Sequence, residues 1–229
     1  MKIYEKVRYP DGSRTIHLFG IKLFSYSPRK LKMGKSNIHI HGKGNEVINA
    51  NPCNSHLTIN IYGKRNRVII NTDQRLSAII NVGTFDCSVS DCEVVIGKDT
   101  TSNGLFLIML ENGSKVHIGE DCMFSDQVQI WASDTHSIIS ADDGRLLNEG
   151  KSVEIGDHCW IGYGCRIMKN SLICPNTVVG MGSIVAGKQT ESNCVITGVP
   201  AKVVKRGINW DRRRPHQYTA DMEKQQARN

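Results

Sequence analysis

The sequence is poor in aromatic residues, contains no long apolar run and has no CxxC pair. Only 6% of its 229 residues are aromatic, while 21 are glycine, a balance that fits a solenoid packed with isoleucine and valine. No apolar run approaches the roughly 18 residues of a membrane span. The opening residues MKIYEKVRYPDGSR carry charges where a signal peptide has an apolar core. We therefore expect no membrane span and a location in the cytoplasm.

The cysteine content indicates whether disulfides are expected, and the net charge indicates which kinds of ligand the protein binds. Eight cysteines without a CxxC pair, in a compartment that keeps thiols reduced, are expected to be packing residues. The formal net charge is +7, but no recognisable nucleic-acid motif accompanies it, so we expect no nucleic-acid partner. A phosphorylated cofactor or an acidic glycan fits the charge at least as well.

The region from Ile155 to Thr190 divides into six blocks of six residues, each opened by an aliphatic side chain. The openers are Ile155, Ile161, Ile167, Ile173, Val179 and Val185, and the fifth places hold Cys159, Cys165, Ser171, Thr177, Ser183 and Gln189. A helix or a flat strand cannot bury a period of six on one face, whereas short strands joined by recurring corners can. The sequence therefore predicts an all-β solenoid, a parallel β-helix of hexapeptide coils.

Four segments are expected along the chain. Residues 1–36 form an N-terminal strand or hairpin segment. Residues 37–93 form wide coils, because IHIHGKGNEVIN at Ile38 to Asn49 recurs as INIYGKRNRVII at Ile59 to Ile70, a spacing of 21 residues. Residues 94–206 hold the hexapeptide coils with an inserted loop at 134–152. Residues 207–229 form a polar tail, expected to be a short helix or disordered, with the arginine run that begins at Arg212 in solvent.

The inserted loop is the expected functional element. Ile118 and Ile155 both open blocks, yet they are 37 residues apart, which is not a multiple of six. Loops that leave a rigid stack are where such scaffolds carry function. His136 is the only histidine on this loop, and an imidazole can take a proton from a hydroxyl and return it. A polar loop histidine without a chemical role is the competing interpretation.

The order SDTH, loop, VEIGDHCWIGYGCRI, GMGSIVAG and GVPAKVVKR resembles the hexapeptide-repeat acetyltransferases. It is most similar to the sugar O-acetyltransferases, which include galactoside, maltose, capsule and lipopolysaccharide O-acetyltransferases. The resemblance covers about Ile118 to Arg206. It implies a left-handed β-helix, a homotrimer, acetyl-CoA as the donor, no required metal, and a saccharide acceptor that the charge suggests is acidic.

The resemblance also implies roles for the residues that match the family's motifs. His136 would be the general base, and Trp160, 24 residues further on, would shape the acceptor pocket beside it. The backbone N–H of Tyr163 would face the thioester oxygen, where such a donor stabilises an oxyanion. The other expected contacts to coenzyme A are Met181, Ala186, Gly187, Lys188, Lys202 and Lys205.

The expected function is acetyl transfer from acetyl-CoA to a sugar hydroxyl, on a bacterial surface glycan of capsule or lipopolysaccharide, by direct attack in a ternary complex. N-acetylation of a nucleotide-linked amino sugar is the alternative within the same fold. A zinc carbonic anhydrase is an alternative from another class, but His117, His136 and His158 do not fall at equivalent places in the coil. A non-catalytic scaffold is the third alternative, and it leaves the inserted loop and PAKVVK unexplained.

Overall fold

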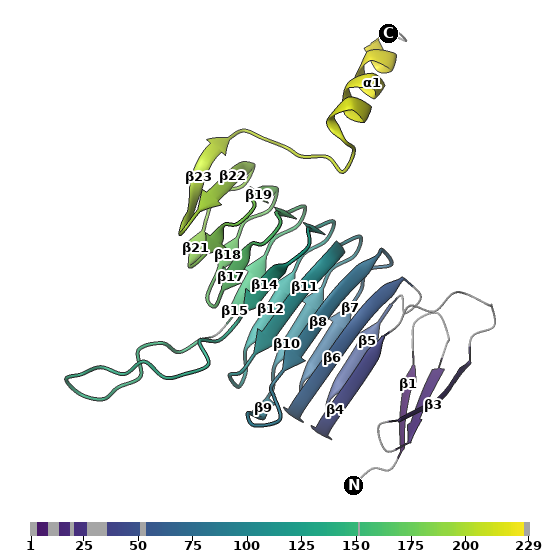
Figure 1. Cartoon of the computed structure of the whole chain (residues 1–229), viewed down its shortest axis with the longest axis vertical. Helices are drawn as coiled ribbons and strands as arrows, with labels where there is room; N and C mark the ends of the chain where they lie inside the picture. The colour runs from purple at the N-terminus through teal and green to yellow at the C-terminus, as the bar shows by residue number, and fades with distance from the viewer. Residues whose placement is uncertain are drawn as a thin grey trace.

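The body of the molecule is a left-handed parallel β-helix, followed by one short helix (Figure 1). The structure, a computed structural model, describes residues 4–8, 14–18, 21–26, 36–50, 54–150 and 152–226. In the C-terminal half each coil has three short sides, which we number in the order in which the chain passes through them.

Each side is a stack of parallel strands from successive coils. The first side consists of β5 (Glu46–Asn49), β7 (Arg67–Ile70), β10 (Glu93–Ile96), β12 (Lys115–Ile118), β15 (Ser152–Ile155), β18 (Leu172–Ile173) and β21 (Lys188–Gln189). The second side consists of β13 (Met123–Phe124), β16 (Trp160–Ile161), β19 (Thr177–Val179) and β22 (Cys194–Gly198). The third side consists of β14 (Val128–Trp131), β17 (Arg166–Met168) and β20 (Ile184–Val185).

The N-terminal coils are wider because long strands replace the separate second and third sides. These strands are β4 (Asn37–Lys43), β6 (Ser55–Lys64), β8 (Leu76–Val82) and β11 (Thr101–Met109), with β9 (Val89–Ser90) beside β6. Ile38 pairs with Ile59, and Ile59 pairs with Ile80, so the 21-residue spacing of the sequence is the register between neighbouring coils. β11 joins the two kinds of coil, because it pairs with β13 near its start and with β14 further along.

The core fills the inside of the prism with the side chains that the hexapeptide pattern predicts. All six block openers from Ile155 to Val185 are buried, as are five of the six fifth-place residues from Cys159 to Ser183. Phe124 is the one aromatic member of the core cluster among the described residues, which explains the low aromatic content. The seven described cysteines are free thiols, and five of them are buried.

The corner between the first and second sides is built in the same way in five successive coils. One residue of each corner adopts a left-handed backbone conformation, with φ between 51° and 58°. Asparagine, aspartate and histidine tolerate this conformation better than other non-glycine residues. We call these five stacked residues the corner column: Asp99, Asp121, His158, Asn176 and Asn193.

The two ends of the chain depart from the coil pattern. β1 (Tyr4–Arg8), β2 (Arg14–Leu18) and β3 (Ile21–Tyr26) form an antiparallel sheet of their own. At the other end β23 (Ala201–Arg206) pairs antiparallel with β22, and α1 (Pro215–Gln226) follows. Within the described ranges no helix has the length and apolarity needed to cross a membrane.

Candidate functional site

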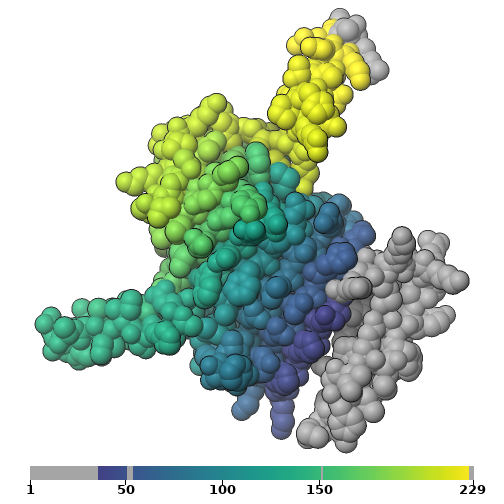
Figure 2. All heavy atoms as spheres, in the orientation of Figure 1, coloured from purple at the N-terminus to yellow at the C-terminus, as the bar shows by residue number. Residues whose placement is uncertain are grey.

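The inserted loop is an arm that projects from the corner between the third and first sides (Figures 1 and 2). It leaves after β14 and returns just before β15, as the interrupted hexapeptide register predicts. The two branches of the arm pair, since Leu147 N–H donates to Ile138 O over 2.8 Å. Four large aliphatic side chains on the arm are more than half exposed: Ile138, Ile139, Leu146 and Leu147. His136 is exposed near the root of the arm.

A polar network fixes the root of the arm around His136. Asn148 Nδ2 donates to the His136 carbonyl oxygen over 2.8 Å and to Asp134 Oδ2 over 2.9 Å. Lys169, on the next coil, pairs with Asp134 Oδ2 at 2.8 Å and donates to the Asn148 carbonyl oxygen. The hydrogen bond from Lys169 holds the pKa of Asp134 below its ordinary value. The backbone of His136 is therefore held by Asn148 on the returning branch of the arm, which Lys169 of the next coil holds in turn.

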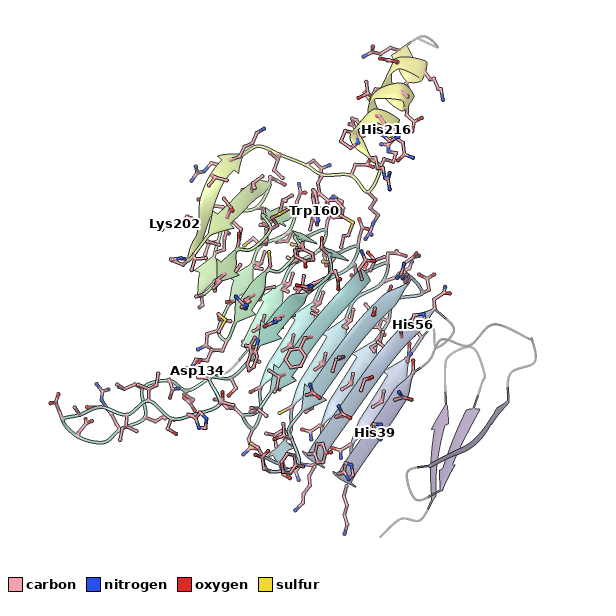
Figure 3. All side chains as sticks on the ribbon, in the orientation of Figure 1. His39, His56, Asp134, Trp160, Lys202 and His216 are labelled. Atoms are coloured by element: carbon pink, nitrogen blue, oxygen red, sulfur yellow. The ribbon has the colours of Figure 1, made fainter. Side chains whose placement is uncertain are left out.

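Trp160 lies at the other edge of the first side, where β16 begins. Figure 3 shows Asp134, at the root of the arm, well apart from Trp160. β15 crosses the first side between them, so the structure does not bring His136 and Trp160 together within one chain. Trp160 is 37% exposed, and its ring lies 6.1 Å from the ring of Trp210, measured between centroids.

The expected coenzyme A contacts lie on the C-terminal coils but at two different corners. Tyr163 and Met181 stack at the corner between the second and third sides, where Gly182 N–H donates to Tyr163 O over 2.8 Å. Both side chains are exposed, at 47% and 75%. Among the hydrogen bonds of the described residues, none uses the Tyr163 N–H. That N–H is therefore available to a ligand.

The other expected contacts lie nearer the arm or on the last strand. Ala186, Gly187 and Lys188 lie at the corner between the third and first sides, the corner that carries the arm two coils earlier. Lys202 and Lys205 are exposed on β23. Within the described ranges, no ion pair uses any of these three lysines, so their charges are not neutralised by the protein.

The tail contributes residues that the sequence interpretation missed. The sequence predicts that the tail is either a short helix or disordered, and the structure contains the helix. The segment before the helix, however, packs against the solenoid. Trp210 is only 8% exposed, and Arg212, expected in solvent, donates to Asp121 Oδ1 over 2.9 Å. The sequence IGDH predicts an exposed His158 at this corner, but His158 is half-buried, with Nδ1 2.6 Å from Asp121 Oδ2. The sequence did carry one signal of this packing: Trp210, a residue type that is usually buried, stands in an otherwise polar tail. Among the described residues no group of three metal-ligating side chains is placed to hold a metal ion.

Comparison with known proteins identifies the family, although no family model matches the chain. The chain is 34% identical over 175 residues to the polysialic acid O-acetyltransferase of Neisseria meningitidis, which covers 76% of this chain and 79% of that protein. The chain belongs to the hexapeptide-repeat O-acetyltransferases. An uncharacterized 24.8 kDa protein in the cps region of Klebsiella pneumoniae is 30% identical over 80% of this chain and 79% of its own length.

Solved structures of the same family agree with this identification. The polySia-specific acetyltransferase NeuO aligns with a TM-score of 0.64 at 27% identity, covering 82% of this chain and 98% of NeuO. The polysialic acid O-acetyltransferase OatWY aligns with a TM-score of 0.54 at 26% identity, covering 80% of this chain and 96% of OatWY. The chain is therefore an acyltransferase that modifies a hydroxyl, and the amino-sugar, carbonic anhydrase and scaffold alternatives are set aside.

Proposed function

We propose that this O-acetyltransferase moves the acetyl group of acetyl-CoA to a hydroxyl of an acidic surface polysaccharide, with His136 as the general base. The position of His136 supports the assignment most directly. It is the only histidine of the projecting arm, its side chain is exposed, and Asn148 holds its backbone at the root. A base must reach a substrate hydroxyl while its own backbone stays in place.

The proposed reaction needs no acyl-enzyme intermediate. The His136 imidazole removes the hydroxyl proton while the sugar oxygen attacks the thioester carbonyl carbon, and a C–O bond forms. The resulting oxyanion accepts a hydrogen bond from the free Tyr163 N–H. The C–S bond then breaks, and the imidazolium returns the proton to the thiolate of coenzyme A. Both substrates must occupy one cleft, so their alignment supplies much of the rate acceleration.

The charge of the chain supports acidic ligands for both substrates. The formal net charge is +7, and Lys188, Lys202 and Lys205 lie on the last coil and on β23, where the phosphates of coenzyme A are proposed to bind. The two similar solved structures are named for polysialic acid, an acidic polymer. A basic protein concentrates such a polymer near its surface. We therefore propose an acidic polysaccharide as the acceptor.

The exteriors of the three sides support a homotrimer as the working form. The exterior of the first side carries a ladder of polar side chains in contact across five successive coils, in the order Glu46, Arg67, Glu93, His117 and Glu154. Side chains of this kind are mostly exposed to solvent in folded proteins. The stack that continues the third side into the wide coils instead presents Ile79 on β8, which is 46% exposed, and the paired rings of Phe106 on β11 and Trp131 on β14 at 5.8 Å. We propose that the third side packs against a neighbouring copy, while the first side faces solvent.

This assembly would complete the site. The arm of one subunit would reach along the second side of its neighbour, which runs from Trp160 at one corner to Tyr163 at the next. His136 of one subunit would then share a cleft with Trp160 of another. The exposed aliphatic side chains of the arm would be covered in the same contact. A cytoplasmic location is part of the proposal, since the seven described cysteines are free thiols.

The decisive experiment measures thiol release from acetyl-CoA with polysialic acid, monomeric sialic acid, neutral dextran or no acceptor. We expect release with the acidic polymer, and an acetylated product that mild alkali reverses, as an ester requires and an amide does not. Equal release with dextran would contradict the acidic acceptor. An absence of release with every acceptor would contradict the reaction itself.

A further inference from the structure

The segment before the helix, residues 207–214, runs back across the solenoid and contacts the whole corner column. We call this segment the strap. Its contacts follow the column in reverse order along the chain. They are Ile208 N–H to Asn193 O at 3.0 Å, Asn176 Nδ2 to Ile208 O at 3.1 Å, His158 Nε2 to Trp210 O at 3.1 Å, Arg212 Nε to Asp121 Oδ1 at 2.9 Å, and Arg212 Nη2 to Asp99 O at 3.1 Å. One strap therefore ties five coils together.

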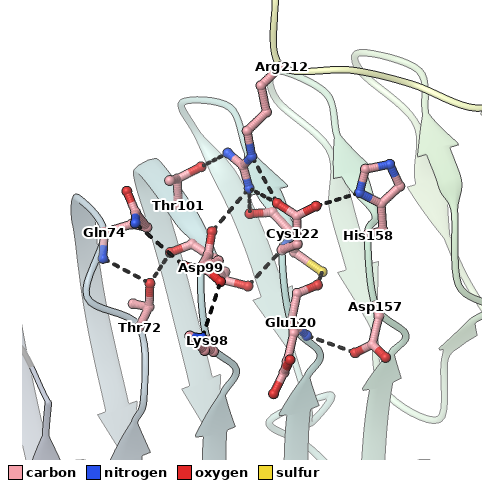
Figure 4. A network of polar contacts seen from close by, with 12 residues as sticks. Thr72, Gln74, Lys98, Asp99, Thr101, Glu120, Cys122, Asp157, His158 and Arg212 are labelled. Carbon is pink, nitrogen blue, oxygen red and sulfur yellow. Dashed lines mark hydrogen bonds and ion pairs between the residues drawn. The ribbon is translucent and has the colours of Figure 1, made fainter.

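Arg212 anchors the far end of the strap (Figure 4). Besides Asp121 and Asp99, its guanidinium donates to Thr101 Oγ1 over 2.8 Å and to Cys122 O over 3.0 Å. Four acceptors from two coils therefore meet one planar group. Lysine carries a single point charge and cannot reproduce this fork of donors.

The carboxylate of Asp121 links this anchor to an aromatic stack. It accepts from Arg212 on one oxygen, and its other oxygen lies 2.6 Å from Nδ1 of His158. Burial alone would raise the pKa of Asp121, but the hydrogen bonds from His158 and Arg212 outweigh burial and lower it. The His158 ring stacks on Trp210 at 4.4 Å with 15° between the planes, and Trp210 Nε1 donates to His158 O over 2.7 Å. Trp210 is thus fixed by both a stack and a hydrogen bond.

The stack ends at the residue that the family resemblance places in the acceptor site. Trp210 meets Trp160 at 6.1 Å with the planes 44° apart, a tilted aromatic contact. One flank of the Trp160 ring is therefore covered by the strap, while 37% of Trp160 stays open to a ligand. We propose that Trp210 is a positioning residue for acetyl transfer: the strap, anchored by Arg212, sets the orientation of the Trp160 ring. This inference rests on the proposed function, because it assumes that Trp160 borders the substrates.

If the strap only links the coils, it stabilises the fold and has no effect on the orientation of the Trp160 ring. A double-mutant cycle separates the two roles, since residues that act through one another are not additive. We expect Trp210→Ala to lower kcat/KM by roughly tenfold in the otherwise unchanged protein, and by much less in a Trp160→Phe background. The fall in thermal stability should be similar in both backgrounds. An equal loss of kcat/KM in the two backgrounds, or a loss of stability alone, would overturn the proposal.

A second measurement needs no turnover and so keeps this proposal separate from the proposed function. The chain has three tryptophans, so 5-fluorotryptophan labelling gives three fluorine resonances that single Trp→Phe variants assign. We expect Arg212→Gln to shift the Trp160 resonance together with that of Trp210. Arg213→Gln is the matched control, because the described side-chain partners of Arg213 are Asp211, Asp221 and Tyr218, all in the tail itself. A Trp160 resonance that Arg212→Gln leaves unmoved would refute the positioning role even in an active enzyme.

Discussion

His136 is exposed, and a single substitution tests its proposed role as the general base. We expect His136→Ala to lower kcat by roughly 10²- to 10⁴-fold, the usual contribution of a general base, and to leave the affinity for coenzyme A unchanged. Steady-state kinetics and calorimetry with coenzyme A measure the two quantities. His216→Ala is the control, because His216 is exposed on α1, which buries no residue. A parallel loss of binding and turnover would contradict the assignment of His136 as the base.

Alanine substitutions at two glycines compare the stability cost of a steric clash with the stability cost of a left-handed backbone conformation. Both have positive φ, +135° at Gly63 and +68° at Gly164. A Cβ on Gly63 would lie 1.7 Å from the Val89 carbonyl oxygen, whereas a Cβ on Gly164 would have no atom within 4 Å. We expect Gly164→Ala to cost about 1–2 kcal/mol, the price of the left-handed conformation. Gly63→Ala should cost more than about 4 kcal/mol or prevent folding.

Denaturant unfolding of both glycine variants checks this expectation, with the midpoints compared at equal slope. Since Gly63 contacts the backbone of the neighbouring coil, no side-chain rotation can relieve the clash. Similar midpoints for the two variants would show that the wide coils can separate locally. The 21-residue register would then be less rigid than the pairing of its strands suggests.

At the scale of the element, the coils were predictable because their signal is local. Each block opener is buried by its own coil, so the period of six in the sequence is the period of burial. The repeat of Ile38 at Ile59 is likewise the register of β4 on β6. The strap was not predictable in this way. Its contacts join residues up to 113 positions apart, and no periodicity encodes them. The one sequence signal was Trp210, a large aromatic residue in an otherwise polar tail.

The polar network at the root of the arm contains one ion pair, between Lys169 and Asp134. Lys169 lowers the pKa of Asp134, so the carboxylate is favoured in the folded protein. The stabilisation is complete above the unfolded pKa of about 3.9 and is lost as pH falls through the lower folded pKa. We expect the protection factors of the Ile138 and Leu147 amides to fall below about pH 4. Amide exchange followed by NMR, corrected for the intrinsic rate, measures this change.

Lys169→Met is the matched variant for the arm, because it removes the charge and keeps most of the side-chain length. In this variant the protection factors should already be low at neutral pH and should change little on acidification. If Lys169→Met keeps the acid transition of the unmodified protein, the ion pair with Asp134 is not what holds the root.

At the scale of the whole molecule, the site could be predicted only in part. The sequence predicts that His136 and Trp160 share a site, but their spacing says nothing about which corners of the prism they occupy. The structure separates them by the width of the first side. Residues on two edges of a rigid prism cannot meet by local rearrangement, so a shared site needs a second copy of the chain. The way in which copies of a chain assemble does not appear as a repeat in its sequence, so the sequence could not predict this requirement.

Mixing two inactive variants tests this requirement. Trimers of His136→Ala alone lack the base, and trimers of Trp160→Ala alone lack the ring. If each site combines His136 of one subunit with Trp160 of the next, random mixed trimers regain both residues in about a quarter of their sites. We therefore expect activity to reappear after the two variants are unfolded and refolded together, and not after they are mixed as folded proteins. If refolding together restores nothing, while each variant still forms trimers, both residues must serve a site within one chain.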